Sequence, residues 1–370
     1  MAIDPIRPFV PVPGQFTAKA SHCTILFVCG SLNQTTQMHQ IAKQLPECSC
    51  YFTPYFCDGA LEVARRAGLV EFTILGQKLT DRCLTYLRSH NLPLDIRGTQ
   101  REYDLVVTCS DLVMPARVRR TKVVLVQEGM TDPENWLFHI VKRLTFLPRW
   151  LASTSTTGLS DAYEAFCVAS DGYRTLFVRK GCDPARVIVT GIPNFDNCIR
   201  YAANGFPYHG YVLVCTSDSR ETFKYENRRK FISSAVALAA GRQLIFKLHP
   251  NENVGRAIRE IRRHAPGALV YPTGSAEEMI ANCEVLITHY SSTALVGLAL
   301  GKEVYADASL DELRRLVPVQ HGKAARNIAE VCRMVLYDGR SPRISRIPGR
   351  VRPFVRHVPE FTMLSGPPTR

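Results

Sequence analysis

The sequence predicts an α/β protein with two parallel sheets. Continuous apolar runs alternate with segments whose apolar residues recur at helical spacing, and this alternation restarts near residue 211. The chain has 370 residues, too many for one ordinary core. Alternating strands and helices form parallel sheets through right-handed crossovers. We therefore expect two tandem Rossmann-like domains that face a cleft, with ligands bound where the strands end.

The first half carries apolar runs that end in polar turns. Strands are expected over Cys23–Ser31, Phe52–Asp58, Tyr103–Asp111, Thr121–Gly129, Phe166–Ala169 and Arg186–Asp196. Helices are expected around Met38, Ile41 and Leu45, over Leu61–Ala67, and from Ser170 onward.

The second half repeats the pattern. Strands are expected within Tyr211–Thr222, Arg242–Pro250, Ala268–Gly274, Glu284–Ser292 and Glu303–Asp307. Helices are expected over Phe231–Ala240, Val254–His264, Ala276–Asn282, Thr293–Gly301 and Ala324–Leu336. The last of these helices is expected to return to the first domain.

A polar segment with Gly and Pro, Tyr201–Gly210, marks the expected domain boundary. It separates an N-terminal Rossmann-like domain, 21–205, from a C-terminal Rossmann-like domain, 206–338. A proline-rich arm, 1–20, precedes them, and a Pro/Arg-rich tail, 339–370, follows.

Composition limits the class of protein. Apolar residues make up 46% and charged residues 21%, the globular range. No apolar stretch reaches the roughly 18 residues that span a bilayer, and the arm lacks a signal-peptide core, so we expect a cytoplasmic protein. The thirteen cysteines lack regular spacing and are expected to be buried and reduced. No residue spacing suggests a metal site.

The net charge of +13 is concentrated in the tail. Residues 340–370 contain seven arginines and one acid, Glu360, and so supply six of the thirteen charges. Two interpretations stay open: solvated surface charge, or attraction to anionic lipids on the inner face of the plasma membrane or to a polyanionic acceptor. Nucleic acid is not expected as a partner, because no recognition motif or interleaved aromatic residue accompanies the charge.

Two post-strand loops carry candidate catalytic residues. Glu128 follows the run VVLV, where an acid is costly unless it is paired or functional, so it is either a general base or a cap or ion-pair partner. His249 ends the strand that contains Lys247, and Pro250 restricts its backbone. An imidazole held there can donate a hydrogen bond or a charge to a phosphate, although a lone histidine is more often structural.

Further candidates lie in neighbouring loops. Ser291, Ser292 and Thr293 precede an apolar helix, where hydroxyls and backbone N–H groups form an anion site as well as a cap. The other candidates are Arg220, Lys247, Thr273 and Gly274 in the second half and Asn33, Gln34, Gln127 and Gly129 in the first half. The absence of GxGxxG and GxxxxGK[ST] argues against a dinucleotide dehydrogenase and a P-loop ATPase.

Three short motifs, Gln127-Glu128-Gly129, His249-Pro250 and Ser291-Ser292-Thr293, occur in an order that resembles bacterial sialyltransferases and Kdo transferases of the GT-B fold. Those families often have an acid where this chain has Gln127. The second half is also similar to CDP-glycerol glycerophosphotransferases and, in HPNENV, more loosely to nonhydrolysing UDP-GlcNAc 2-epimerases. The resemblance covers about Val123 to Val304.

The resemblance implies a metal-independent glycosyltransferase that needs no cofactor beyond a nucleotide-sugar donor, with a CMP-sugar favoured and a UDP-sugar as the alternative. Glu128 would be the base that activates a glycan or lipid-linked acceptor, and His249 with Ser291–Thr293 would stabilise the leaving phosphate. The domain 21–205 would bind the acceptor, and the domain 206–338 would bind the nucleotide-sugar donor. The acceptor-side candidates are then Asn33, Gln34, Gln127 and Gly129, and the further donor-side candidates are Arg220, Lys247, Thr273 and Gly274. The alternatives are a glycerophosphotransferase, a 2-epimerase, or a non-catalytic sugar-nucleotide binding protein.

Overall fold

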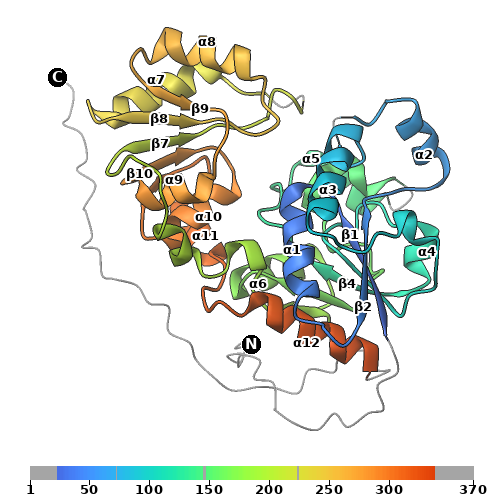
Figure 1. Cartoon of the computed structure of the whole chain (residues 1–370). Coiled ribbons are helices and arrows are strands. Elements are labelled where there is room, and N and C mark those ends of the chain that lie inside the picture. The colour runs from blue at the N-terminus through green and yellow to red at the C-terminus, as the bar shows by residue number, and fades with distance from the viewer. Residues whose placement is uncertain (1–22, 72, 145–146, 223–224, 338–370) are drawn as a thin grey trace, which may run out of the picture. The chain divides into compact units, whose positions relative to one another are not determined.

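The computed structural model describes residues 23–71, 73–144, 147–222 and 225–337. Two parallel sheets organise these residues (Figure 1). The first sheet has the strand order β2-β1-β3-β4-β5-β6. Its strands are β1 (Thr24–Cys29), β2 (Ser49–Pro54), β3 (Leu105–Thr108), β4 (Lys122–Val126), β5 (Ala165–Val168) and β6 (Val187–Val189).

Helices and short 3₁₀ turns connect these strands. The helices are α1 (Leu32–Ala42), α2 (Gly59–Arg66), α3 (Gln77–Ser89), α4 (Ala116–Arg119), α5 (Trp136–Arg143) and α6 (Asp171–Lys180). The 3₁₀ segments are η1 (Ile96–Gly98), η2 (Arg149–Thr156), η3 (Pro193–Phe195) and η4 (Cys198–Ala202).

The second sheet has the order β11-β10-β7-β8-β9, also parallel throughout. Its strands are β7 (Val212–Cys215), β8 (Leu244–Lys247), β9 (Leu269–Tyr271), β10 (Val285–Thr288) and β11 (Glu303–Tyr305). Its helices are α7 (Arg228–Ala239), α8 (Val254–His264), α9 (Ala276–Asn282), α10 (Ser292–Ala299) and α11 (Leu310–Leu316). The α/β class with two Rossmann-like sheets is confirmed.

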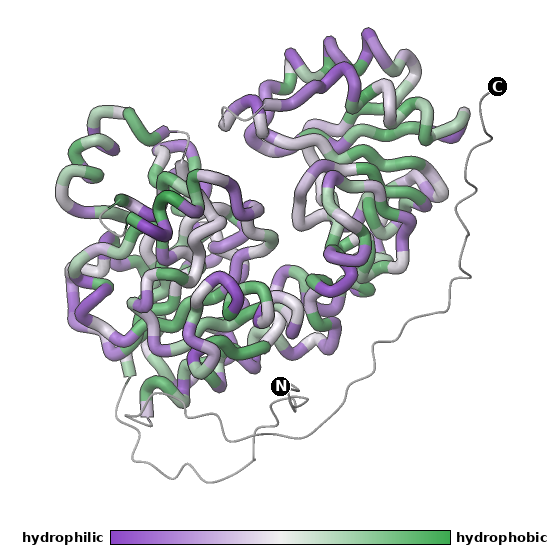
Figure 2. Tube along the Cα trace, turned by 180° about the vertical axis from the view of Figure 1, so that it is seen from behind, coloured by the Kyte–Doolittle hydropathy of each residue, from purple (hydrophilic) through white to green (hydrophobic). Residues whose placement is uncertain are grey.

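The central strands are buried on both faces because helices cover both sides of each sheet, whereas the edge strands β2, β9 and β11 are partly exposed. In β7, Val212 and Val214 pack beneath α7 and α8, whereas Leu213 and Cys215 belong to the core on the opposite face. Figure 2 accordingly shows the strands mostly in the hydrophobic colour. Such two-sided burial accounts for the continuous apolar runs in the sequence.

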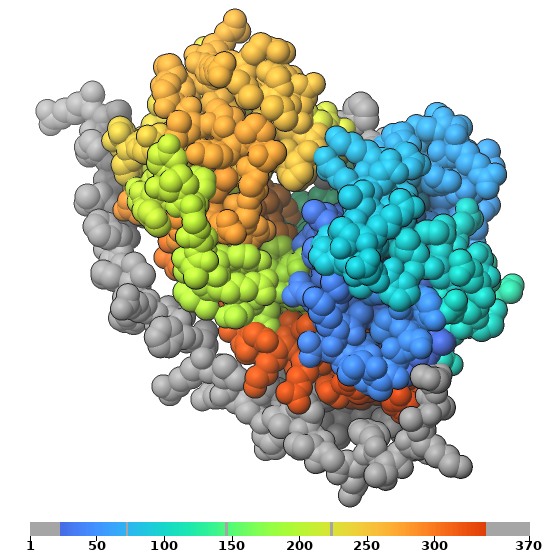
Figure 3. All heavy atoms as spheres, viewed as in Figure 1, coloured from blue at the N-terminus to red at the C-terminus, as the bar shows by residue number. Residues whose placement is uncertain are grey.

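The last described helix, α12 (Ala324–Tyr337), packs against α1, β3, β4 and β5 of the first sheet, as expected (Figure 3). Asp196 receives the N–H groups of Gly322 and Ala324, both at 2.7 Å, at the start of α12. Lys122 Nζ donates to the carbonyl of Val335 at 2.8 Å, which suits a cation at a helix C-terminus. The predicted domain bounds stay a prediction, and both the arm, 1–20, and the tail, 339–370, lie outside the described residues.

Element boundaries differ from expectation mainly in the first sheet. The second strand is Ser49–Pro54, three to four residues earlier than Phe52–Asp58. Helices α3 and α5 were not expected, although both lie in the described part of the chain. The sequence interpretation relied on unbroken apolar runs and therefore missed helices whose residues are of mixed polarity.

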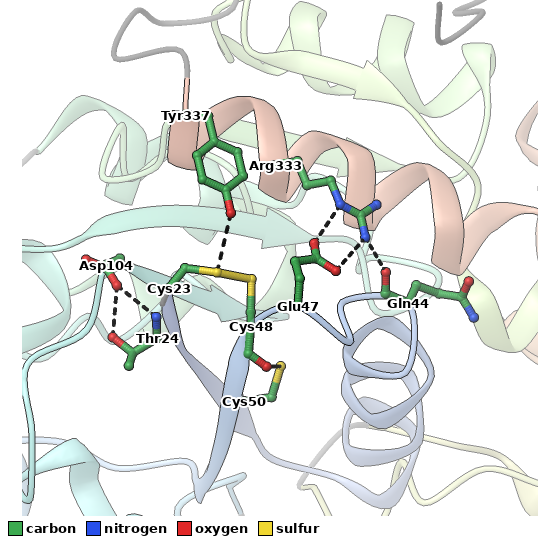
Figure 4. Close-up of a disulfide and its surroundings, with 9 residues drawn as sticks. All are labelled: Cys23, Thr24, Gln44, Glu47, Cys48, Cys50, Asp104, Arg333 and Tyr337. Atoms are coloured by element: carbon green, nitrogen blue, oxygen red, sulfur yellow. Dashed lines mark hydrogen bonds and ion pairs between the residues drawn. A yellow bond between two sulfur atoms is a disulfide. The ribbon is translucent and has the colours of Figure 1, made fainter. Parts of the chain in front are cut away.

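Two cysteines are joined, contrary to the expectation that all are reduced. Cys23 and Cys48 form a disulfide between the starts of β1 and β2 (Figure 4). The cause is register: the parallel pairing of Thr24 with Ser49 brings the two preceding residues to a Cα–Cα distance of 4.9 Å. Cys50 stays a partly exposed thiol, and the other ten cysteines are buried thiols.

Reduction of the Cys23–Cys48 bond should destabilise the fold. The bond closes a loop with a sequence separation of 25 residues. A loop of that size predicts a loss of about 3 kcal/mol in the free energy of unfolding when the bond is absent. Urea unfolding of the oxidised protein with and without dithiothreitol measures this, with Cys50→Ser as the control that should leave the reductant effect intact. Equal stabilities with and without reductant would contradict the prediction.

Candidate functional site

Glu128 lies where β4 ends, against the first turn of α1. Ser31 Oγ donates to its Oε1 at 2.8 Å, and Gln34 Nε2 donates to its Oε2 at 2.6 Å. Its backbone carbonyl accepts from the side-chain amides of Asn33 and Gln37, both at 3.3 Å. A carboxylate at a helix N-terminus is favoured by the local N–H dipoles. The predicted acid is thus held in one orientation, and each carboxylate oxygen has a further lone pair that can accept a proton.

Gln127 stabilises the loop that carries Glu128. Its side chain is buried, its Nε2 donates to the carbonyl of Gly129 at 2.7 Å, and its Oε1 accepts the N–H of Ala169 at 2.9 Å. These bonds tie the end of β4 to the end of β5. The observed role of Gln127 is therefore to shape the loop, and its contact with an acceptor stays a prediction.

The loop after β4 meets the start of α10 in the second sheet. The N–H of Met130 donates to Ser292 Oγ at 2.8 Å. A Cβ on Gly129 would lie 2.7 Å from the same oxygen, so any larger residue would separate the two loops. The structure therefore brings together the first and third predicted motifs, which are more than 160 residues apart in the sequence.

Two hydroxyls of the third motif, those of Ser291 and Thr293, bond to each other. Ser291 caps α10 and accepts both the N–H of Thr293 at 3.3 Å and its hydroxyl at 3.0 Å. Thr288 Oγ1 lies 3.2 Å from Thr293 Oγ1. The capping interpretation thus holds, and the anion site at the same helix start stays a prediction.

His249 is fixed at the end of β8 by three neighbours. Its N–H donates to Thr216 Oγ1 at 3.1 Å, its Nδ1 accepts the N–H of Asn251 at 3.3 Å, and its Nδ1 lies 3.5 Å from Asp218. Burial lowers the pKa of His249, and the Asp218 carboxylate opposes that shift. A neutral ring that accepts through Nδ1 carries its proton on Nε2. The side chain is 37% exposed, so this Nε2–H can serve as a donor to a ligand.

A buried carboxylate, Glu252, anchors the His249 loop. Thr216 Oγ1 donates to it at 2.5 Å and Arg228 at 2.6 Å, and its side chain is fully buried. Because Thr216 also accepts from His249, the Glu252 contacts set the position of the histidine backbone. Asn253 caps α8, so residues 251–253 all have observed contacts.

The network continues to the ends of β10 and β11. Arg228 Nε lies 2.7 Å from Glu226, whose carboxylate lies 3.3 Å from His289 Nε2. His289 Nδ1 lies 2.6 Å from Asp307. Burial opposes protonation of His289, but its hydrogen bonds to Glu226 and Asp307 prevail and raise its pKa. The sequence reasoning missed these residues, and the available signal was a polar residue directly after a buried strand.

The remaining donor-side candidates occupy different environments. Arg220 makes a two-pronged contact with Glu260, at 2.8 Å for each nitrogen. Lys247 is buried and donates to the carbonyl of Leu248 at 2.8 Å, and burial lowers its pKa. Thr273 and Gly274 are exposed at the end of β9. Arg220 and Lys247 are therefore already bonded to other groups of the protein. Binding of the nucleotide-sugar donor by Arg220, Lys247, Thr273 and Gly274 stays a prediction.

A cavity of about 510 Å³ adjoins the two loops that meet at Ser292. That volume lies in the range of small-molecule pockets. Its walls include Tyr290 of the third motif's loop, Asp307, and Lys180 of α6, together with Thr131–Glu134 and residues of α11. None of the predicted site residues is in its wall, so this cavity extends the candidate site rather than forming its centre.

The described ranges contain neither a metal-binding cluster nor a membrane-spanning helix. No cluster of His, Cys, Asp or Glu there could hold a metal ion. No helix there has the length and apolar character needed to cross a bilayer.

No protein-family profile and no curated protein matches this sequence. Solved structures do match. A UDP-N-acetylglucosamine 2-epimerase has 14% identity and a TM-score of 0.54, covering 89% of this chain and 100% of its own. A UDP-N-acetylglucosamine 2-epimerase described as putative, from Listeria monocytogenes, has 11% identity, a TM-score of 0.54, and coverage of 90% and 100%. The wall teichoic acid polymerase TagF has 11% identity, a TM-score of 0.50, and coverage of 87% and 92%.

These matches confirm the predicted GT-B fold. At such low identity they establish a shared fold and not a shared reaction. The three proteins do not include a sialyltransferase or a Kdo transferase, so that narrower resemblance stays a prediction.

The raised pKa of His289 predicts a pH-dependent contribution to stability. A histidine whose pKa is higher in the folded state stabilises fully below its unfolded value of about 6.5, and this contribution is lost as pH rises through the folded pKa. Compared between about pH 5.5 and 8, the stability difference between wild type and His289→Gln should therefore be largest below about pH 6.5 and shrink as the pH rises above it. Thermal unfolding across that range measures it. His39 is the control, because burial lowers its pKa and His39→Gln should show the opposite slope. A pH-independent difference for His289→Gln would contradict the ion-pair assignment.

Proposed function

We propose that this protein is a GT-B enzyme that transfers a sugar from a nucleotide-activated donor to a hydroxyl of a glycan or lipid-linked acceptor, without a metal ion. The observation that carries the proposal is the contact of the Glu128 loop, through the Met130 N–H, with Ser292 at the start of α10. A base and a phosphate-binding helix start at adjacent strand ends are the two groups that such a displacement needs.

In this mechanism Glu128 accepts the proton of the acceptor hydroxyl as the oxygen attacks the anomeric carbon. Ser31 and Gln34 hold the carboxylate in position for that step. As the bond to the nucleotide phosphate breaks, charge develops on the phosphate oxygens. His249 Nε2–H and the first N–H groups of α10 are the donors proposed to stabilise it. A CMP-sugar is the favoured donor and a UDP-sugar the alternative.

The structural neighbours favour a second candidate, epimerisation of a nucleotide sugar. One similar structure, from Neisseria meningitidis, is a UDP-GlcNAc 2-epimerase bound to UDP-GlcNAc, with 11% identity, a TM-score of 0.51, and coverage of 84% and 99%. An epimerase converts its donor without any acceptor. Product analysis after incubation with donor alone therefore separates the two reactions. A glycerophosphotransferase differs in the group transferred and would release CMP only from a CDP-polyol.

Replacement of Glu128 by Gln should remove the base while keeping the two hydrogen bonds to its backbone carbonyl, provided that the Gln34 amide turns so that its oxygen accepts from the new NH2 group. We expect turnover to fall by roughly 10²–10⁴-fold, with little change in nucleotide affinity. An assay of nucleotide release measures the turnover rate, and a titration with the nucleotide measures the nucleotide affinity. Glu164→Gln is the matched control. Glu164 directly precedes β5 and so lies at the amino end of the strand, whereas the candidate site lies at the carboxyl ends. Near-normal turnover in Glu128→Gln would show that another group is the base.

A nucleotide panel tests donor binding. Thermal unfolding is measured with CMP, CDP, UDP and GDP, since a ligand at about 100 times its Kd adds about 2.7 kcal/mol of stability. We expect the largest shift with CMP and a much smaller shift in His249→Ala. His209→Ala, an exposed histidine of the interdomain segment, should behave as wild type. No shift with any nucleotide would refute the proposed function, and an unchanged shift in His249→Ala would refute the phosphate role.

A further inference from the structure

The cavity of about 510 Å³ beside the candidate site has a wall in which charged residues outnumber apolar ones. Its acidic residues are Asp132, Glu134, Asp307 and Glu312. Its cations are Arg179 and Lys180, in the last turn of α6. These six residues come from the loop after β4, from α6, from the loop after β11 and from α11. The mechanism proposed above uses none of them, so the cavity still lacks a role.

The side chains of this wall lie close to one another although they come from separate elements. Tyr290, in the loop after β10, also belongs to the wall. Burial raises the pKa of Tyr290 to about 12, and the charges of Glu312 and Asp132 add to the increase. Burial lowers the pKa of Lys180, and the charges of Glu134 and Asp132 oppose that change. The phenol, the ammonium group and these three carboxylates are therefore near enough to interact around one cavity.

Two charged groups of the wall are held in place by the rest of the fold. Lys180 is only 2% exposed, and its Nζ donates to the carbonyl of Ser155 at 3.1 Å. An ammonium group has three N–H donors, so two remain for a ligand or for a carboxylate of the wall. Asp307 lies 2.6 Å from His289 Nδ1. The cavity thus has a fixed donor on the side of the first sheet and a fixed acceptor on the side of the second.

The charge balance of the wall limits the kind of ligand. Four carboxylates against two cations leave two negative charges, and a protonated His289 paired with Asp307 still leaves one. A phosphate or an acidic sugar would meet repulsion there. Carboxylates only accept hydrogen bonds and the two cations only donate them, whereas a sugar hydroxyl does both. The apolar face of a sugar ring can also pack on the ring of Tyr290. A neutral sugar satisfies all of these groups.

We propose that this cavity is a subsite for a neutral sugar unit of the acceptor. The inference rests on the proposed function, in which Glu128 activates the acceptor hydroxyl. The wall segment Thr131–Glu134 belongs to the same loop as Glu128, and Glu128 itself is outside the wall. The cavity therefore takes a sugar unit adjacent to the one that carries the reacting hydroxyl. The acceptor class that follows is a neutral glycan and not a polyanionic polymer.

An array of defined oligosaccharides, probed with the labelled full chain, tests the ligand class. The array carries neutral glycans, such as lactose, maltotriose and diacetylchitobiose, beside acidic ones, such as sialyllactose and heparin fragments. It is probed with and without CMP, so that a requirement for bound nucleotide does not hide the interaction. We expect binding to neutral glycans, and calorimetric titration of the best one gives its Kd. Preferential binding to acidic glycans, or no binding under either condition, would overturn the proposal.

Matched variants locate the bound glycan. Glu312→Ala should raise its Kd by roughly tenfold, the scale of a lost hydrogen bond to a charged group. Asp311→Ala is the control, because Asp311 is the exposed neighbour of Glu312 on α11 and lies outside the wall. Tyr290→Ala should also weaken binding, whereas Tyr225→Ala, 91% exposed and outside the wall, should not. Equal effects within either pair would place the glycan elsewhere and refute the cavity as its site.

The outcomes separate this inference from the proposed function. Glu312→Ala should keep the wild-type thermal shift with nucleotide, because Glu312 lies outside the proposed phosphate site. A wild-type protein that shows the nucleotide shift and Glu128-dependent turnover, but whose glycan affinity ignores the wall variants, would refute the subsite alone. A protein that binds neutral glycans through the wall but shows no nucleotide shift would refute the proposed function and leave a glycan-binding cavity.

Discussion

The contact between the loop after β4 and the start of α10 determines how the candidate site is assembled. A single hydrogen bond, from the Met130 N–H to Ser292 Oγ, joins the carboxyl ends of two different sheets. Gly129 makes it possible, because a side chain there would collide with that hydroxyl. Carboxyl ends of parallel strands are where open α/β sheets bind ligands, so this contact combines two half-sites into one.

The two half-sites are supported in different ways. Glu128 is held by neutral donors from the first turn of α1. The His249 loop is instead held by Glu252, whose buried charge is paired with Arg228. A buried pair of this kind contributes more to a unique geometry than to stability, because desolvation offsets most of the attraction. The first arrangement keeps a carboxylate available for chemistry, and the second keeps an imidazole in place.

Much of the fold could be predicted from the sequence, because strands covered on both faces produce unbroken apolar runs. The runs ending at Val126, Lys247 and Thr288 all became strands, and Glu128, His249 and Ser291 all lie directly beyond them. Arg220 illustrates what could not be predicted. Its position in a polar loop after β7 suggested a phosphate partner, but Glu260, forty residues later on α8, engages both of its terminal nitrogens. Pairing across helices leaves no local trace in the sequence.

The sequence by itself determined the α/β class, the two sheets and the strand-end positions of the three motifs, because these depend on local periodicity and on apolar burial. Only the tertiary structure decided which strand ends meet, which charges are already paired and which apolar residues stay outside. The Cys23–Cys48 bond depends on the register of β1 with β2. The network from Glu252 to Asp307 depends on four loops at the carboxyl ends of the second sheet. The exposure of Trp136 depends on the packing of Phe138 and Val141, which occupy the small core with Ala152 instead. Each is a property of distances between segments far apart in the chain, which composition and spacing do not encode.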